Sequence, residues 1–152
     1  MRNGLIRLFA VISLTLTALL CCQFGFSQEK KAVNVSNATG LPFSPGIIAG
    51  NTIYVAGQEG EDENGKLVAG GIGPETKAAL DNISKILKAG GYDLKDVVNV
   101  TVYLADIKDF PEMNKVYKTV VPDPKPARAT IQAAALVNNA RIEIAVIAVK
   151  QK

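Results

Sequence analysis

The pattern of apolar and polar positions divides most of the chain into strands and helices. Runs of β-branched or alternating apolar residues are typical of strands. They occur at 33–35, 47–49, 53–56, 97–104, 126–131 and 142–149. Gly50-Asn51 lies between the second and third runs, so these two strands are expected to form a hairpin.

Two further segments have the period of amphipathic helices. The first is expected to begin near Pro74 and to end at Gly90-Gly91. The second is expected to begin at Asp109, with Glu112 three residues later completing a capping box, and to end at Pro122. Each has a buried stripe at helical spacing: Ala79, Leu80, Ile83, Ile86 and Leu87 in the first, and Met113, Val116, Tyr117 and Val120 in the second. The order β-β-β-α-β-α-β-β predicts an α+β domain with both helices on one face of a single sheet.

The last two predicted strands carry the most informative charged residues. In the final strand Ile142, Ile144, Val146 and Ala148 share one face, and Glu143 lies among apolar residues on the other. Arg128 follows a proline-rich turn at the start of the preceding strand. We expect this guanidinium and this carboxylate to lie on two adjacent strands.

Arg128 is the best candidate for binding an anion. A guanidinium presents a planar fork of donors that holds a carboxylate through two hydrogen bonds, and it stays charged near neutral pH. The alternative is a purely structural arginine, paired with an aspartate or exposed at the strand end. Thr130 shares the face of Arg128 and offers a hydroxyl group, and Gly57 allows close approach to a ligand, although β-propensity and a turn explain them equally well.

Glu143 is the candidate general base. Desolvation on an apolar face favours the neutral form of a carboxyl group, which suits it to take up and return a proton near neutral pH. The alternatives are an ion pair with Arg141 or a lysine, and simple exposure at a sheet edge. The residues alone do not decide between these interpretations.

The N-terminal segment has the features of an export signal. Arg2 and Arg7 precede an apolar run at 8–20 that is short for a bilayer span, and small residues lie before a cleavage position after Ser27. We therefore predict a signal peptide at 1–27, a single domain at 28–152, no stable membrane anchor after cleavage, and a periplasmic or secreted protein. Lipidation at Cys21 or Cys22 is a minor alternative, as is an uncleaved anchor.

Signal cleavage changes the composition and restricts the chemistry. The chain has 17 basic and 14 acidic residues, so losing Arg2 and Arg7 leaves a net charge of +1. This balance disfavours nucleic acid as a partner. The sequence has no histidine, and both cysteines lie in the predicted signal, which excludes Ser-His and Cys-His nucleophiles and the usual soft metal ligands from the mature chain. We expect no metal site.

Two weaker patterns favour structural interpretations. Gly70-Gly71-Ile72-Gly73 precedes a helix but completes no phosphate-binding motif. The carboxylates around the predicted turn at Asn64-Gly65 are able in principle to gather a hard cation, and a solvated loop is the commoner explanation. They are Glu59, Glu61, Asp62 and Glu63.

The combined motifs of the chain resemble the Rid family, also called the YjgF or L-PSP family. The resemblance covers about 33–150. The matching segments are 54–58, 89–91, 99–104, 106–110, 126–130 and 142–149, together with Asn114 and Tyr117. It implies a chorismate-mutase-like fold and a homotrimer with ligand clefts between its subunits.

The resemblance also implies an activity. The best-understood members hydrolyse imines or enamines, such as 2-iminobutanoate and 2-aminoacrylate, to 2-oxo acids and ammonia without a cofactor. In that scheme Arg128 binds the substrate carboxylate, Glu143 positions water and transfers protons, and backbone near Gly57 and Arg128 contacts the substrate. The remaining positions matched to the substrate site are Phe43, Ala56, Asn114 and Thr130.

Two of these positions, Phe43 and Ala56, depart from the pattern of the active deaminases. Phe43 stands where a tyrosine is common and Ala56 where a serine is common, whereas Thr130 stands where cysteine or a small hydroxyl residue is common. Each hydrogen bond lost from a buried site costs about 1 kcal/mol. Two other functions therefore stay open: a non-enzymatic protein of the same fold that binds a small carboxylate and, less favoured by the charge balance, an endoribonuclease.

Overall fold

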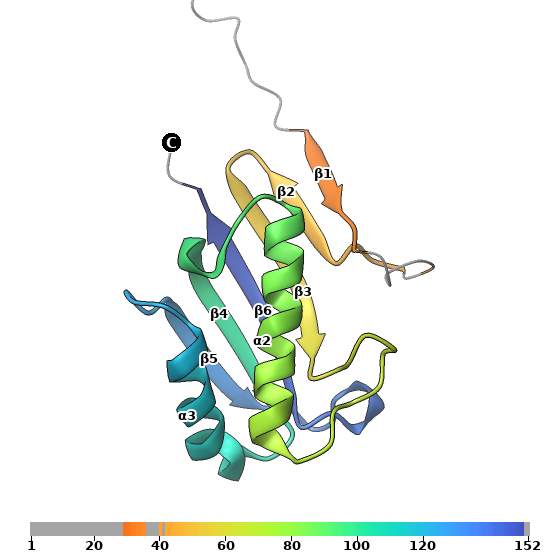
Figure 1. The fold of residues 1–152 in the computed structure, drawn as a ribbon, viewed down its shortest axis with the longest axis vertical. Helices are drawn as coiled ribbons and strands as arrows, with labels where there is room; N and C mark the ends of the chain where they lie inside the picture. The colour runs from red at the N-terminus through yellow and green to blue at the C-terminus, as the bar shows by residue number, and fades with distance from the viewer. Residues whose placement is uncertain (1–28, 36–39, 41, 151–152) are drawn as a thin grey trace, which may run out of the picture.

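The computed structural model describes residues 29–35, 40 and 42–150. Six strands form one mixed sheet in the order β1-β2-β3-β6-β4-β5 (Figure 1). The strands are β1 (Lys30–Val33), β2 (Gly46–Ala49), β3 (Thr52–Glu59), β4 (Val97–Leu104), β5 (Ala127–Gln132) and β6 (Ile142–Val149). Only the β4–β5 pair is parallel, and the other neighbours are antiparallel.

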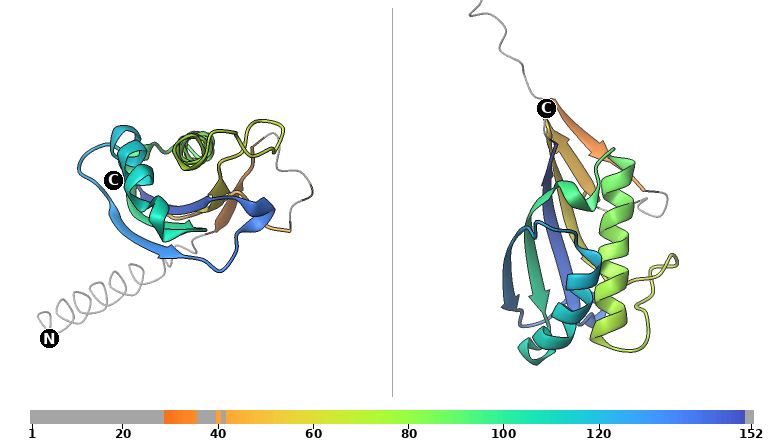
Figure 2. Two further views of the ribbon diagram at one scale, coloured as in Figure 1. Left: turned by 90° about the horizontal axis from the view of Figure 1, so that it is seen from below. Right: turned by 60° about the vertical axis from the view of Figure 1, so that its left-hand side comes forward.

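Two α-helices, α2 (Ile72–Ala89) and α3 (Phe110–Val120), cover the same face of the sheet (Figure 2). Short 3-10 turns at Leu94–Asp96, Ile107–Asp109 and Val137–Asn139 complete the described elements. The observed element order is the predicted one, and the α+β architecture with both helices on one face is confirmed.

The core lies between the sheet and α2. Leu80, Ile83 and Leu87 of the helix are almost fully buried, as are Ile144 of β6 and Val102 of β4 beneath them. Burial alternates strictly along β6, where the even-numbered residues Ile142 to Ala148 enter the core and the odd-numbered ones do not. Glu143 therefore lies on the face without helices, as its strand parity predicts.

Strand adjacency is the main correction. Because β6 pairs with β3 on one side and β4 on the other, β4 separates β5 from β6. Arg128 and Glu143 are therefore not on adjacent strands. The order of strands depends on tertiary pairing, which local periodicity does not contain.

The helix and strand starts also differ from expectation. Strand β1 covers Lys30–Val33 rather than 33–35, and α2 begins at Ile72, two residues before Pro74. The expected capping box does not form: Asp109 makes no cap hydrogen bond, and its carboxylate accepts hydrogen bonds from Arg141 instead. The preceding 3-10 turn is capped by Asp106, which accepts from the Lys108 amide.

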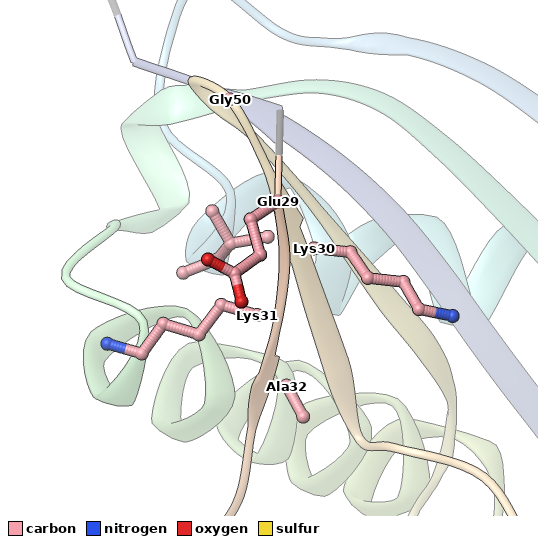
Figure 3. A pocket seen from close by; sticks show the side chains of 6 residues that line it. Glu29, Lys30, Lys31, Ala32 and Gly50 are labelled. Carbon is pink, nitrogen blue, oxygen red and sulfur yellow. The ribbon is translucent and has the colours of Figure 1, made fainter. Parts of the chain in front are cut away.

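The β1 edge is a charged and shallow surface. Figure 3 shows Lys30 and Lys31 pointing to opposite sides of the strand, beside Glu29 and Gly50, around a hollow remote from the residues predicted to be functional. Lysines on an edge strand discourage pairing with another chain. Among the described residues, no helix is long and apolar enough to cross a bilayer.

Candidate active site

Arg128 is held by one face of helix α3. It lies on β5 opposite Val100 of β4, a fully buried residue, so its side chain lies on the face covered by helices. The guanidinium donates to Asn114 Oδ1 at 2.7 Å and lies 4.5 Å from the ring centroid of Tyr117. The ring of Phe110 is 5.6 Å away, and Met113 Sδ is 3.9 Å from Nη1.

These four contacts follow from helical spacing. Phe110, Met113, Asn114 and Tyr117 occupy positions i, i+3, i+4 and i+7, which share one side of a helix. Two aromatic rings stabilise a guanidinium through cation–π contacts, and the amide fixes its orientation. The stripe on α3 therefore has a second role besides packing on the core.

Arg128 has no acidic partner in the part of the chain that the structure describes. The salt bridge formed by an arginine there belongs to Arg141, which pairs with Asp109 at 2.8 Å. The interpretation of Arg128 as one half of a structural ion pair is therefore wrong. An oriented, half-buried guanidinium without a counter-ion is suited to bind an anionic ligand.

Tyr117 supports the guanidinium through its ring. The residue is only 4% exposed, and its hydroxyl oxygen has no hydrogen-bond partner among the described residues. Burial raises the pKa of Tyr117, and the nearby Arg128 charge opposes that shift. Thr130, two residues after Arg128, is paired with the buried Val102 and shares the same face, as predicted.

The side chain of Glu143 packs directly against Gly57. A β-carbon built at Gly57 would overlap Glu143 Oε1 and lie 2.6 Å from its Cδ. The register of β3 against β6 shifts between Val55 and Gln58, so Gly57 lies within a bulge. A bulge re-aims the strand locally, and glycine leaves the space that the carboxylate occupies. The ion pair between Glu143 and Arg141 that the sequence left open does not form.

A cleft of about 1110 Å³ surrounds this carboxylate. Four of the predicted site residues line it together: Phe43, Ala56, Gly57 and Glu143. It lies along the part of β3 that extends beyond the end of β2, because the β2–β3 pairing stops at Gly46 and Val55. A further hydrogen bond, from the Ala56 amide to the Pro45 carbonyl at 2.9 Å, holds the cleft wall.

The predicted residues therefore form two separate groups in one chain. Phe43, Ala56, Gly57 and Glu143 line the cleft, whereas Arg128, Asn114 and Thr130 lie at β5 and α3. Arg128 is on the face covered by helices and Glu143 is on the opposite face. A single copy of the chain does not bring the anion anchor and the base together.

Comparison with known proteins identifies the family. The family model described as Endoribonuclease L-PSP matches residues 34–150. The chain belongs to the Rid (L-PSP) family. A human 2-iminobutanoate/2-iminopropanoate deaminase is 43% identical over 127 residues, covering 82% of this chain and 93% of the human protein. Its bovine counterpart is 49% identical with the same coverage.

Solved structures of Rid-family proteins have the same fold. A Thermotoga maritima structure superposes with a TM-score of 0.77 at 40% identity, covering 82% of this chain and 100% of that one. The Escherichia coli YjgF gene product gives 0.74 at 31% identity, covering 80% and 99%. The predicted chorismate-mutase-like architecture is thus confirmed.

One residue of this Rid-family cleft was not recognised from the sequence. The sequence pattern places Glu59 in an acidic turn, but Glu59 is the last residue of β3, pairs directly with Glu143 of β6 and lines the cleft. Burial, followed by the charges of Glu61 and Glu143, raises the pKa of Glu59 to about 7. The available signal was its spacing: it lies two residues beyond Gly57 on the same strand.

The acidic turn does not have the geometry of a cation site. Asp62 Oδ1 accepts from the backbone amides of Asn64 and Lys66 at 2.9 and 3.0 Å, which closes the turn and lowers the pKa of Asp62. Within the described residues, no group of three or more acidic, histidine or cysteine side chains is placed to hold a metal ion.

Proposed function

We propose that this Rid-family chain hydrolyses small 2-imino acids, such as 2-iminobutanoate, to 2-oxo acids and ammonia. The observation that carries the proposal is an arginine oriented by α3 without a counter-ion, together with a carboxylate seated on a glycine in a cleft. Relatives from human and cattle that are named for this reaction align with the chain over 93% of their length.

The residues suit each step of the reaction. Arg128 holds the substrate carboxylate through two charge-assisted hydrogen bonds. Glu143 takes a proton from a water molecule, whose oxygen adds to the carbon of the C=N bond. Proton transfer to nitrogen then allows the C–N bond to break, which releases ammonia and forms the C=O bond of the oxo acid. Water adds to the carbon and ammonia leaves from it with no change of oxidation state, so the reaction needs no redox cofactor.

The complete site is proposed to form between copies of the chain. The β5 and α3 group of one copy meets the Glu143 cleft of the next, which is a head-to-tail contact and closes as a ring. A homotrimer is the assembly proposed here. Tyr54 and Ile131, on the face of Glu143, are 50% and 49% exposed in the single chain, and an apolar surface of this kind favours such an interface.

The proposed enzyme is exported, with a signal peptide at 1–27 and one domain at 28–152. The cleavage position and both ends of the chain lie outside the described residues. Mass spectrometry of the protein exported by its host is expected to give the mass of residues 28–152. A mass that includes residues 1–27 would contradict the proposal. RNA cleavage is disfavoured because the cleft rim carries the acidic residues Glu61, Asp62 and Glu63, which repel phosphate.

The direct test generates 2-iminobutanoate from its amino acid with an oxidase and follows the release of 2-oxobutanoate. Addition of the protein is expected to accelerate release above the spontaneous rate. An unchanged rate, with 2-oxobutanoate still raising the melting temperature, would instead establish a carboxylate-binding protein.

Gly57→Ala separates activity from stability. The new methyl group must displace the Glu143 carboxylate, which is the flexible end of a side chain, so kcat is expected to fall about tenfold or more with little change in melting temperature. At Gly60 a β-carbon would lie 2.5 Å from Glu75 Cα, which is backbone. Gly60→Ala is therefore expected to destabilise the fold by about 1–3 kcal/mol.

Kinetics and thermal melts of the two variants test this contrast. Wild-type kcat in Gly57→Ala would show that the close contact between Gly57 and Glu143 has no role in turnover.

A further inference from the structure

We propose that Glu59 is a positioning residue of this site, which holds a proton when substrate is bound and so keeps the cleft's charge low enough for a carboxylate to enter beside Glu143. This inference rests on the proposed function and extends it, because Glu59 belongs to neither predicted group of site residues.

The first support is the position of Glu59 in the sheet. Glu59 and Glu143 are direct cross-strand partners at the end of the β3–β6 ladder, and both line the cleft. Like charges opposite one another on neighbouring strands repel. The backbone of Glu59 is fixed there, because its carbonyl accepts from the Glu61 amide at 2.9 Å and from Asn82 Nδ2 at 3.4 Å. The repulsion is therefore not relieved by moving the strand end.

The second support is that two neighbouring acids, Glu61 and Glu75, are held by hydrogen-bond donors of their own. Glu61 Oε1 accepts from Asn138 Nδ2 at 3.1 Å, and Glu75 Oε2 accepts from the Arg141 amide at 2.8 Å. The Glu61 carboxyl group is also in hydrogen-bonding contact with Glu59. A protonated Glu59 donates to Glu61 and relieves the repulsion.

The charged surroundings of Glu59 are predominantly acidic. The titratable and charged groups that face it or share its cleft come from β6, the loop after β3, and α2. They are Glu143, Glu61, Asp62, Glu63, Glu75 and Lys85, of which only Lys85 is basic. Lys85 Nζ is directed to Asn82 Oδ1 at 3.3 Å. An anionic substrate entering this cleft adds one more negative charge and therefore favours the protonated form of Glu59.

The affinity for an anionic ligand is expected to fall as pH rises, because the ligand favours the protonated form of Glu59. When pH rises through about 7, Glu59 ionises and the cleft becomes more repulsive to a carboxylate. Binding of 2-oxobutanoate is expected to weaken by about threefold to tenfold between about pH 6 and pH 8. Glu59→Gln cannot ionise, and its affinity is expected to stay nearly constant over that range.

The test is an NMR titration of isotope-labelled glutamate carboxyl carbons in the assembled protein. Wild type is expected to show one glutamate signal that titrates near pH 7, and this signal is expected to be missing from Glu59→Gln. Its titration midpoint is expected to rise when 2-oxobutanoate is added and to fall in the Glu143→Gln variant. Glu112→Gln, on the exposed side of α3, is the matched control and is expected to leave the titration unchanged.

Three results would overturn the inference: no glutamate titrating near pH 7 in wild type, a signal that persists in Glu59→Gln, or a midpoint insensitive to 2-oxobutanoate. A midpoint that responds to 2-oxobutanoate without turnover of 2-iminobutanoate would support the inference while contradicting the deaminase function. Failure of the Glu59 inference and failure of the deaminase function therefore give different results.

Discussion

Glu143→Gln is expected to lower kcat for 2-iminobutanoate hydrolysis by about two to four orders of magnitude, which is the range that a general base contributes. Glutamine has nearly the shape of glutamate, so the contact with Gly57 is retained, but the amide does not take a proton from water. Binding of 2-oxobutanoate is expected to be retained or tightened, because Arg128 supplies the attraction for its carboxylate and the substitution removes a negative charge from the cleft.

Steady-state kinetics and calorimetric titration with 2-oxobutanoate measure the two effects separately. Glu112→Gln is the matched control, since Glu112 lies on the exposed side of α3 and pairs with Lys115 at 2.9 Å. Loss of binding together with turnover would show that Glu143 acts by shaping the cleft rather than as a base. Wild-type kcat would remove Glu143 from the mechanism.

Arg128→Ala is expected to lower kcat/KM by at least about a hundredfold. Two hydrogen bonds between a guanidinium and a carboxylate are together worth about 3 kcal/mol or more, and each 1.36 kcal/mol corresponds to about a factor of ten. Because the same bonds are made in the bound substrate, the loss is expected mainly in KM. Arg128→Lys is expected to recover only part of it, because an ammonium group lacks the planar fork and its stacking on Tyr117.

The matched control for this second variant is Arg141→Ala. Arg141 immediately precedes β6, and its side chain is 47% exposed and paired with Asp109. Kinetics with varied 2-iminobutanoate production and thermal shift with 2-oxobutanoate are the measurements. Equal kcat/KM for Arg128→Ala and Arg141→Ala would show that the guanidinium at Arg128 does not bind substrate.

The sequence predicts the faces of strands better than their neighbours. The alternation from Ile142 to Val149 correctly places Glu143 away from the core, because the period of a strand is a local property. It does not show that β6 enters the sheet between β3 and β4, since pairing depends on contacts with strands far away in sequence. The expected adjacency of Arg128 and Glu143 fails for this reason.

Glu59 illustrates the same limit within the site. The sequence predicts a strand at 53–56, but the bulge after Val55 lets β3 continue to Glu59, which pairs with Glu143. Bulges depend on both strands and leave little trace in one of them. In contrast, the stripe Met113, Val116 and Tyr117 was predictable from helical spacing, and Met113 and Tyr117 now contact Arg128 as well as the core.

In the proposed site, Arg128 and Glu143 act together but come from different copies of the chain. Mixing Arg128→Ala and Glu143→Gln subunits, each with a strongly reduced kcat/KM alone, in equal amounts under conditions that exchange subunits tests this directly. Random assembly gives about one quarter of the sites an intact arginine from one copy and an intact glutamate from its neighbour. We expect recovery of about one quarter of the wild-type kcat/KM, and no recovery despite confirmed subunit exchange would show that Arg128 and Glu143 of different copies do not share a site.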